Sequence, residues 1–248
     1  MNIHTEPPAP DKAPARLSQA EVKGIIVGLI LAMLLAALDQ TIVATAMPTI
    51  GHELGDLNNL PWIVTAYLLT STAVTPLYGK LSDIHGRRIM LLVAIGIFSI
   101  GSVACALAPT MLALGLARGL QGLGGGGLLA LSQTIIGDLV TPRERAQYQV
   151  YIASVFVMSS LAGPILGGFF AEHLHWSLIF WINLPLGLLA YLMTSDKLKR
   201  LPRFLTAWLW LVFIVPGWIA WGLISVWFLY RIVKGMVRMN AGRAVEAA

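Results

Sequence analysis

GKLSDIHGRR, residues 79–88, joins two long apolar runs through a short stretch that is dense in charge. Its cationic side chains are Lys80, Arg87 and Arg88. Asp83 lies among them, and Gly79 and Gly86 keep the turn tight, because glycine adopts backbone conformations that other residues avoid. A basic loop between two apolar runs is typical of a membrane protein, which uses such loops to fix its orientation.

The composition extends this interpretation to the whole chain. Of its 248 residues 57% are hydrophobic and only 12% are charged, with a mean hydropathy of +0.75, whereas soluble domains have about 25% charged residues. A chain of this size cannot hide several apolar runs of about 20 residues in a water-soluble core. We therefore expect an all-α polytopic membrane protein whose main partner is the lipid bilayer.

The remaining composition excludes other classes. The net charge of +5 comes from basic residues in short loops, so we expect no nucleic-acid partner. Cys105 is the single cysteine, which leaves no disulfide or cysteine metal site within one chain. His173 and His175 have only Glu172 as a further nearby ligand, so we expect no metal. The sequence shows no pattern typical of an enzyme.

Six membrane spans are expected, and the charges of their loops predict their orientation. The expected spans are residues 23–47, 61–81, 89–108, 111–136, 147–170 and 177–195. The loops after the second, fourth and sixth spans carry Lys and Arg, whereas the loops after the other three carry neither. The positive-inside rule then places the N-terminus and the even-numbered loops in the cytoplasm.

The two ends of the chain differ from this bundle of residues 21–195. Residues 1–20 are rich in Pro and Ala and are expected to form a disordered cytoplasmic tail. Residues 196–230 comprise a basic loop and a Trp-rich membrane segment, and residues 231–248 form a basic tail. Because Pro216 and Gly217 interrupt the Trp-rich segment, it is either one extra kinked helix or a short hairpin.

Two charged residues stand deep inside the expected spans, whereas Lys23 and Lys80 lie at span ends. Asp39 belongs to LDQTIVATAMP, residues 38–48, and Arg118 to LARGLQGLGGGG, residues 116–127. At 1.5 Å per residue both lie roughly 10–14 Å from the outer boundary, a depth that permits an ion pair. An intramembrane charge is costly and marks a functional site by default, although Arg118 could also be a purely structural ion-pair partner.

The glycines around these charges have two further interpretations. Gly122, Gly124 and Gly127 satisfy the dinucleotide pattern G-x-G-x-x-G, but they lie inside an expected span with no preceding strand, which excludes that site. Instead, Gly115/Gly119 and Gly122/Gly126 have the spacing that lets two membrane helices approach closely.

SSLAGPILGG, residues 159–168, places a proline mid-span, which taken alone indicates an ordinary kinked helix.

Taken together, these motifs resemble the major facilitator superfamily over residues 21–193, and specifically its drug:proton antiporter branch with fourteen spans. The loop at 79–88 resembles the family's signature loop. Three further stretches resemble other motifs of the family, namely R-x-x-Q-G-x-G, G-P-x-x-G-G and L-D-x-T-I-V-x-x-A-L-P. Met47 replaces the usual leucine, and HWSLIFWINLPLG, residues 175–187, lacks the arginine usual at the start of the sixth span. The last quarter of the chain shows no such motif.

The resemblance implies a fold, a function and roles for individual residues. The fold would be the six-helix N-terminal bundle of a facilitator, and the function would be proton-coupled efflux of hydrophobic or cationic drugs across a bacterial inner membrane, driven by the proton gradient without a bound cofactor. Proton coupling would fall to Asp39 and Arg118. Gating would fall to Gly79, Asp83, Gly86, Arg87, Arg88 and Asp138, and bending of the fifth span to Gly163, Pro164, Gly167 and Gly168.

One bundle cannot close a transport cavity alone, because alternating access rocks two halves around a central site. The chain would therefore need a second copy of itself or a separately encoded C-terminal half. The alternative is a membrane module that transports nothing: a remnant, an assembly factor or a regulator of a full-length antiporter.

Overall fold

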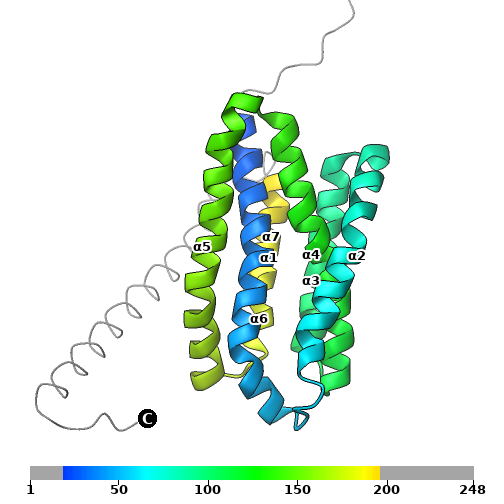
Figure 1. Ribbon diagram of the computed structural model, residues 1–248, viewed down its shortest axis with the longest axis vertical. Helices are drawn as coiled ribbons and strands as arrows, with labels where there is room; N and C mark the ends of the chain where they lie inside the picture. The colour runs from blue at the N-terminus through cyan, green and yellow to red at the C-terminus, as the bar shows by residue number, and fades with distance from the viewer. Residues whose placement is uncertain (1–18, 196–248) are drawn as a thin grey trace, which may run out of the picture. The chain divides into compact units, whose positions relative to one another are not determined.

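The computed structural model describes residues 19–195, and the chain divides into two units after Ser195. The described part is a bundle of α-helices (Figure 1). The helices are α1 (Gln19–Glu53), α2 (Pro61–His85), α3 (Arg87–Ala106), α4 (Met111–Leu139), α5 (Pro142–His173), α6 (Leu178–Trp181) and α7 (Asn183–Thr194). Residues 1–18 of the tail predicted at 1–20, the Trp-rich segment and the basic C-terminal tail lie outside the described residues, and α1 begins at Gln19.

The helices form two groups that lie side by side. In one group α1 packs against both α5 and α7, and in the other α4 packs against both α2 and α3. Figure 1 shows α5 and α1 next to each other, with α4, α3 and α2 beside them. Contacts of α1 with α4 and of α3 with α7 join the groups. This arrangement confirms the predicted all-α six-span bundle.

The helix ends follow local sequence signals. Gly86 alone separates α2 from α3, with φ +91° and ψ 135°, and its N–H donates to the Ser82 carbonyl. Residues with a side chain rarely adopt this φ, which explains the glycine in the turn. At the start of α5, Thr141 and Glu144 form a capping box. Its hydrogen bonds hold the pKa of the exposed Glu144 carboxyl below the ordinary value.

A proline borders the first predicted span and another lies inside the sixth, and neither helix ends at its proline. The first span was expected to end before Pro48, but α1 continues through this proline to Glu53, as helices in membrane proteins tolerate proline. The sixth span was expected to be one helix, and Leu178–Thr194 is one apolar helical stretch in which Ile182, with helical φ −62° and ψ −23°, joins α6 to α7. Pro185 lacks the N–H that would bond to the Trp181 carbonyl, which weakens the helix at this position.

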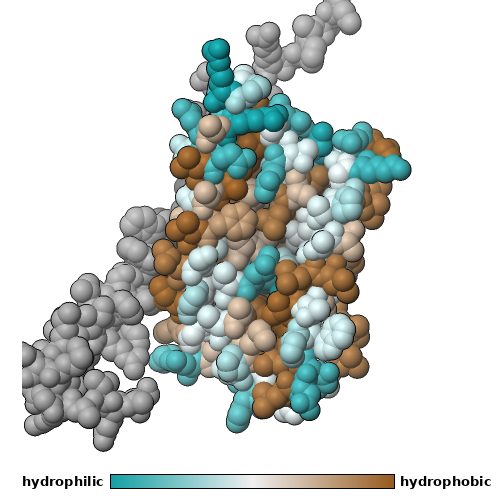
Figure 2. All heavy atoms as spheres, in the orientation of Figure 1, coloured by the Kyte–Doolittle hydropathy of each residue, from teal (hydrophilic) through white to brown (hydrophobic). Residues whose placement is uncertain are grey.

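The described helices suit a membrane environment. By length and apolarity three of them can span a bilayer: Gly24–Glu53, Arg87–Ala106 and Pro142–His173. With 25 and 29 residues, α2 and α4 are also long enough, but their Ser, Thr and Gly residues lower the hydropathy. On the face in Figure 2, most hydrophilic residues lie toward the two ends and hydrophobic or pale residues between them.

Close helix packing in the second group depends on the glycines of α4. Added Cβ atoms at Gly122 and Gly126 would overlap α2, and one at Gly124 would overlap the backbone of α3. Small residues permit such backbone approach between membrane helices. The predicted small-residue spacing in the fourth span therefore serves contacts within the bundle, where α4 is the central helix of its group.

Candidate functional site

Asp39 of α1 and Arg118 of α4 form an ion pair inside the bundle. The distance from Arg118 Nη1 to Asp39 Oδ2 is 2.6 Å, and each residue is only 1% exposed. The pairing that equal depth permitted is therefore present in the structure. An unpaired charge at this depth would be expensive, whereas a hydrogen-bonded pair offsets much of that cost.

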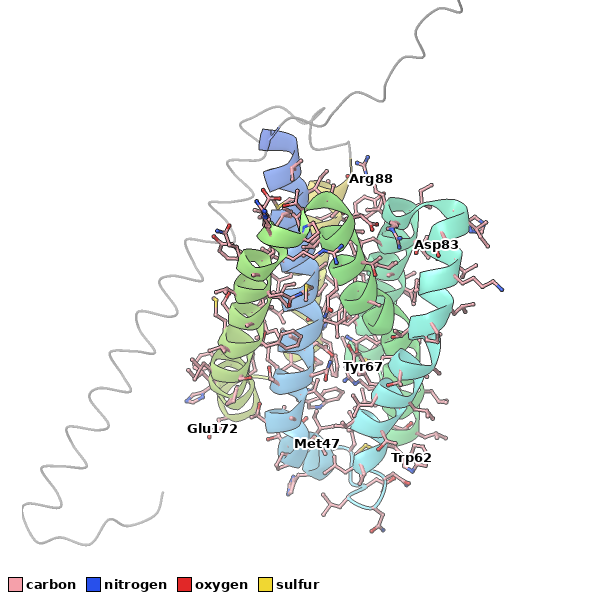
Figure 3. The ribbon with its side chains drawn as sticks, turned by 45° about the horizontal axis from the view of Figure 1, so that its top comes forward. Met47, Trp62, Tyr67, Asp83, Arg88 and Glu172 are labelled. Atoms are coloured by element: carbon pink, nitrogen blue, oxygen red, sulfur yellow. The ribbon has the colours of Figure 1, made fainter. Side chains whose placement is uncertain are left out.

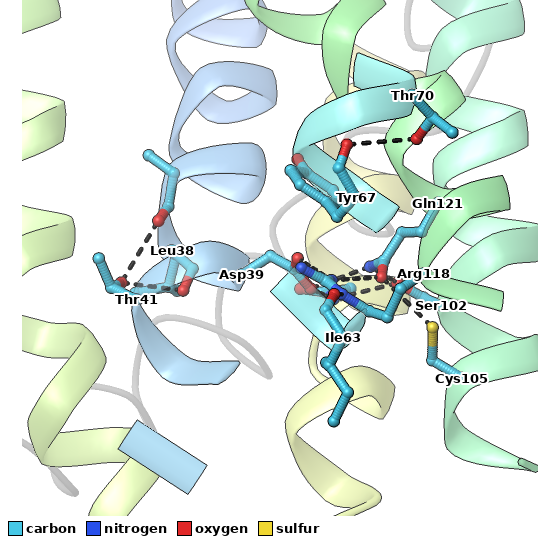
Figure 4. Close-up of polar contacts among 12 residues, drawn as sticks. Leu38, Asp39, Thr41, Ile63, Tyr67, Thr70, Ser102, Cys105, Arg118 and Gln121 are labelled. Atoms are coloured by element: carbon cyan, nitrogen blue, oxygen red, sulfur yellow. Dashed lines mark hydrogen bonds and ion pairs between the residues drawn. The ribbon is translucent and has the colours of Figure 1, made fainter. Parts of the chain in front are cut away.

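Two amide side chains complete the environment of the Asp39 carboxylate (Figure 4). Gln121 Nε2 and Asn183 Nδ2 both donate to Asp39 Oδ1, at 2.9 and 2.7 Å. The same two amides donate to Ser102 Oγ, at 2.7 and 3.0 Å. All of these side chains are buried, so three donors stabilise the ionised carboxylate.

Arg118 is also held on its remaining sides. Its Nε donates to the backbone carbonyl of Ile63 (3.1 Å), and its Nη1 donates to Gln121 Oε1 (2.6 Å). The guanidinium carbon lies 4.3 Å from the centre of the Tyr67 ring, a cation–π contact. The guanidinium is thus fixed by α2 and by its own helix as well as by Asp39.

We call Asp39, Ser102, Arg118, Gln121 and Asn183 the buried polar network. It lies between two apolar clusters, one including Leu35 and Phe98 and the other including Ile42 and Phe180. Its members come from α1, α3, α4 and α7, so it joins the two helix groups. Chemically, it holds one negative and one positive charge in a dry site, where the loss or gain of one proton changes the hydrogen bonding of every member.

Three members of this network were not predicted from the sequence. Gln121 could have been found, because it lies three residues after Arg118 and side chains with that spacing share a helix face. Ser102 and Asn183 gave no signal, since single uncharged polar residues are common in membrane spans and their direction depends on helix rotation. The structure therefore extends the predicted pair to a network of five residues.

The predicted gating residues meet at one end of the bundle. Arg87, at the start of α3, contacts Asp138 at the end of α4. Its Nη2 also lies 3.4 Å from Oδ1 of Asp83, four residues earlier in α2. Figure 3 shows Asp83 and Arg88 at the end opposite Trp62 and Glu172. Arg88 contributes differently: its Nε donates to the Thr194 carbonyl (2.6 Å), which joins the start of α3 to the end of α7. A Cβ added at Gly79 would meet no described atom within 4 Å, and the Gly79 carbonyl accepts a hydrogen bond from Ser82 Oγ (2.7 Å).

The glycines of the predicted antiporter motif pack α5 against α1. Added Cβ atoms at Gly163 and Gly167 would overlap the side chains of Thr41 and Thr45, one helical turn apart on α1. Gly168 has open space within the described part of the chain, and α5 is continuous through Pro164. Two of the four residues predicted to allow bending therefore also have a packing role.

At the other end of the bundle, His175 lies near an acidic residue of α1. His175 Nε2 lies 3.6 Å from Glu53 Oε2, and no group of three potential metal ligands occurs in this part of the chain. The contact joins the end of α1 to the loop before α6.

Proteins similar to this chain are efflux and multidrug transporters by name. The multidrug transporter protein MdtP of Bacillus subtilis is 43% identical over 175 residues, which are 71% of this chain and 32% of that protein. Multidrug resistance protein 3 of the same species is 41% identical over 69% of this chain and 34% of its own length. The efflux pump dotC of Dothistroma septosporum is 46% identical over 67% of this chain and 28% of its own length. The chain thus spans about a third of the length of these relatives.

Solved structures share the fold of this chain, and a family model identifies its family. A crystal structure of a D-xylose-proton symporter superposes with a TM-score of 0.62 at 18% identity, covering 90% of this chain and 55% of that one. The inward-open xylose transporter XylE of E. coli superposes with a TM-score of 0.57 at 17% identity, over 73% of this chain and 48% of that one. The family model matches residues 29–244 and so extends into the last quarter, where the sequence shows no family motif. The chain is a multi-pass membrane protein that belongs to the Major Facilitator Superfamily.

Proposed function

We propose that the chain is the N-terminal bundle of a proton-coupled efflux transporter for hydrophobic or cationic compounds. The observation that carries this proposal is the buried Asp39–Arg118 pair, supported by Gln121, Ser102 and Asn183. The names of the similar proteins support efflux as the direction of transport.

The pair suits proton coupling because Asp39 is a titratable group held in a dry site. In the present conformation three donors favour the ionised carboxylate, and Arg118 balances its charge. A rearrangement that moves Arg118 away removes this balance and leaves a buried carboxylate without its partner. Coupling of this kind links proton uptake at Asp39 to the relative position of α1 and α4.

The gating cluster supplies a second element of this mechanism. The contacts of Arg87 with Asp83 and Asp138 fix the turn between α2 and α3 to the end of α4. Breaking and reforming these contacts would let that end open and close. Gly168 of α5, which has no close neighbour in the described residues, leaves room for bending beside Pro164.

A bundle of this size needs a second wall. Alternating access moves two halves around a shared site, and this chain spans about a third of its relatives. The second wall would be another copy of this chain or a separately encoded C-terminal half. We place the complete transporter in a bacterial inner membrane, with the N-terminus in the cytoplasm.

The test is dye efflux from proteoliposomes under an imposed pH gradient. The purified chain would be reconstituted alone and together with the C-terminal half of a relative, using a fluorescent cationic dye as the substrate. Efflux by the chain alone indicates a homodimer, and efflux only in the mixture indicates a split transporter. Asp39→Asn should abolish the dependence on the pH gradient, whereas Asp56→Asn in the α1–α2 loop should preserve it.

The alternative proposal is a membrane module that transports nothing and assembles with a full-length antiporter, because one bundle supplies only one wall of a transport cavity. No dye movement under either condition, together with co-purification of a full-length relative, would support this function and exclude transport by the chain.

A further inference from the structure

Asn183 has an unusual position in the buried polar network. Its Nδ2 donates both to Asp39 Oδ1 (2.7 Å) and to Ser102 Oγ (3.0 Å). Its Oδ1 is buried and has no hydrogen-bond partner within residues 19–195. A buried carbonyl oxygen without a partner has given up its hydrogen bonds to water without replacement, so this half of the amide calls for an explanation.

Gln121 provides the contrast. Its Nε2 donates to Asp39 and Ser102, as the Asn183 amide does, but its Oε1 accepts a hydrogen bond from Arg118 at 2.6 Å. Turning the Gln121 amide over would direct its N–H groups at the guanidinium, which itself carries only donors. Gln121 is therefore fixed in one orientation. Asn183 loses no bond at its oxygen on turning, although the turn breaks the two bonds of Nδ2 and moves Nδ2 to the place of Oδ1, where residues 19–195 offer no partner.

The orientation of Asn183 matches one protonation state of Asp39. With the carboxylate ionised, an N–H must face Oδ1, because a carbonyl oxygen there would repel the negative charge. With Oδ1 protonated, the new O–H group is a donor and faces the N–H groups of both Gln121 and Asn183. A neutral Asp39 in this place therefore needs an acceptor that no neighbour offers in the present orientation.

We propose that Asn183 is a positioning residue that turns its amide over when Asp39 takes a proton, and so presents Oδ1 as the acceptor for the neutral carboxyl group. The proton from solution binds Asp39 Oδ1, the new O–H donates to Asn183 Oδ1, and Arg118 keeps its charge and its bond to Gln121. Ser102 Oγ, an acceptor from Asn183 before the turn, then donates its hydroxyl hydrogen to the same Oδ1. This inference rests on the proposed function, because it requires Asp39 to exchange protons.

The ionisable groups around Asp39 define the controls. They are Arg118 on α4, Tyr67 on α2 and Cys105 on α3. Neither α1 nor α7 adds another ionisable side chain to the network. A pH-dependent signal that arises from Asp39 must therefore disappear in Asp39→Asn and persist in Cys105→Ser.

Infrared difference spectroscopy tests the turn directly. The full chain would carry asparagine labelled with 13C at the side-chain carbonyl, and spectra would be recorded in lipid on stepping the pH down. We expect the Asn183 carbonyl band to fall in frequency when Asp39 is protonated, because its oxygen gains hydrogen bonds, and to stay unchanged in Asp39→Asn. Asn183→Leu identifies the band, with Asn183→Ser as a second variant, and Asn59→Ser in the exposed α1–α2 loop is the matched control.

The possible results separate the turn from the proposed function. Two results contradict the turn of Asn183 but support proton exchange at Asp39. In both, the Asp39 carboxyl band titrates. The Asn183 carbonyl band either stays unchanged or is already low in frequency at high pH. A complete absence of a titrating carboxyl band overturns both the turn and proton exchange. A shift that remains in Asp39→Asn assigns the movement to another group and also overturns the proposal.

Discussion

Arg118 Nη1 lies 2.6 Å from Asp39 Oδ2, so an ion pair with almost no solvent contact joins the first and fourth spans. The two residues belong to different helix groups, and the pair therefore connects the halves of the bundle. The predictions below start from this pair and then address the packing and the orientation around it.

Removing one partner of the pair should lower the stability of the protein far more than removing both partners. Asp39→Leu or Arg118→Met alone leaves an uncompensated buried charge, which costs about 3–5 kcal/mol of unfolding free energy, whereas replacing both charges by apolar side chains is often neutral. We expect the double variant to melt well above either single variant in detergent, as followed by circular dichroism. If the stability losses of the two single variants simply add in the double variant, the result would contradict the pairing.

Glycines of α4 should differ sharply in their tolerance of alanine. A Cβ at Gly126 overlaps the backbone of Ser71, whereas one at Gly119 lies 3.7 Å from the Thr70 methyl, an ordinary contact. Because alanine favours helix over glycine by about 1 kcal/mol, Gly119→Ala should be neutral or slightly stabilising. Gly126→Ala should destabilise by about 1–3 kcal/mol. Thermal melting of the two variants in one detergent measures the difference.

Adjacent glycines of α5 separate packing from bending. Gly167→Ala should lower thermal stability, because its Cβ overlaps Thr45 of α1, whereas Gly168→Ala should leave stability unchanged. If bending at this position serves transport, Gly168→Ala should slow dye efflux in the reconstituted system at unchanged stability. Full efflux by Gly168→Ala would exclude bending at this residue.

The contact between Arg87 and Asp138 should hold the basic end of the bundle together. Both side chains are partly exposed, so the loss in Asp138→Asn should be modest, about 0.2–1 kcal/mol. The clearer measurement is amide hydrogen exchange, which should become faster in the turn around Gly86. The exchanged pair Arg87→Asp with Asp138→Arg should restore slow exchange, and Asp56→Asn at the opposite end should have no effect.

The orientation can be measured with single cysteines. Leu57 in the α1–α2 loop and Ile84 near the α2–α3 turn are both 67% exposed and lie at opposite ends of the bundle. In a Cys105→Ser background, a membrane-impermeant maleimide should label Leu57→Cys in intact cells and label Ile84→Cys only after permeabilisation. The reverse pattern would place the N-terminus outside.

Charge made one part of the site predictable. Asp39 and Arg118 stand out because charged residues are rare in apolar runs, and helix geometry then gives their depth. Gating contacts of Arg87 were found through a motif with demanding spacing. The contact of Arg88 with the Thr194 carbonyl has no such signal, because its acceptor is a backbone atom that every residue possesses.

Helix rotation and proline effects were the harder part. Whether Ser102 and Asn183 face the network depends on how α3 and α7 turn about their axes, which follows from the packing of the whole bundle. Proline ends neither of the two helices in question: α1 runs through Pro48, and the backbone stays helical from Leu178 through Pro185 to Thr194. Its effect depends on which neighbours accommodate the lost bond, and those neighbours are distant in the chain.

The buried polar network also has a consequence for the order of events when this protein is inserted into the membrane. Asp39 emerges from the ribosome 79 residues before Arg118 and 144 residues before Asn183. During that interval the first span carries a carboxylate without its partners, and the insertion machinery or a proton must compensate for it. Insertion of α7 therefore completes the assembly of the bundle. We expect membrane quality control to recognise a nascent chain that stops before residue 183 as incomplete.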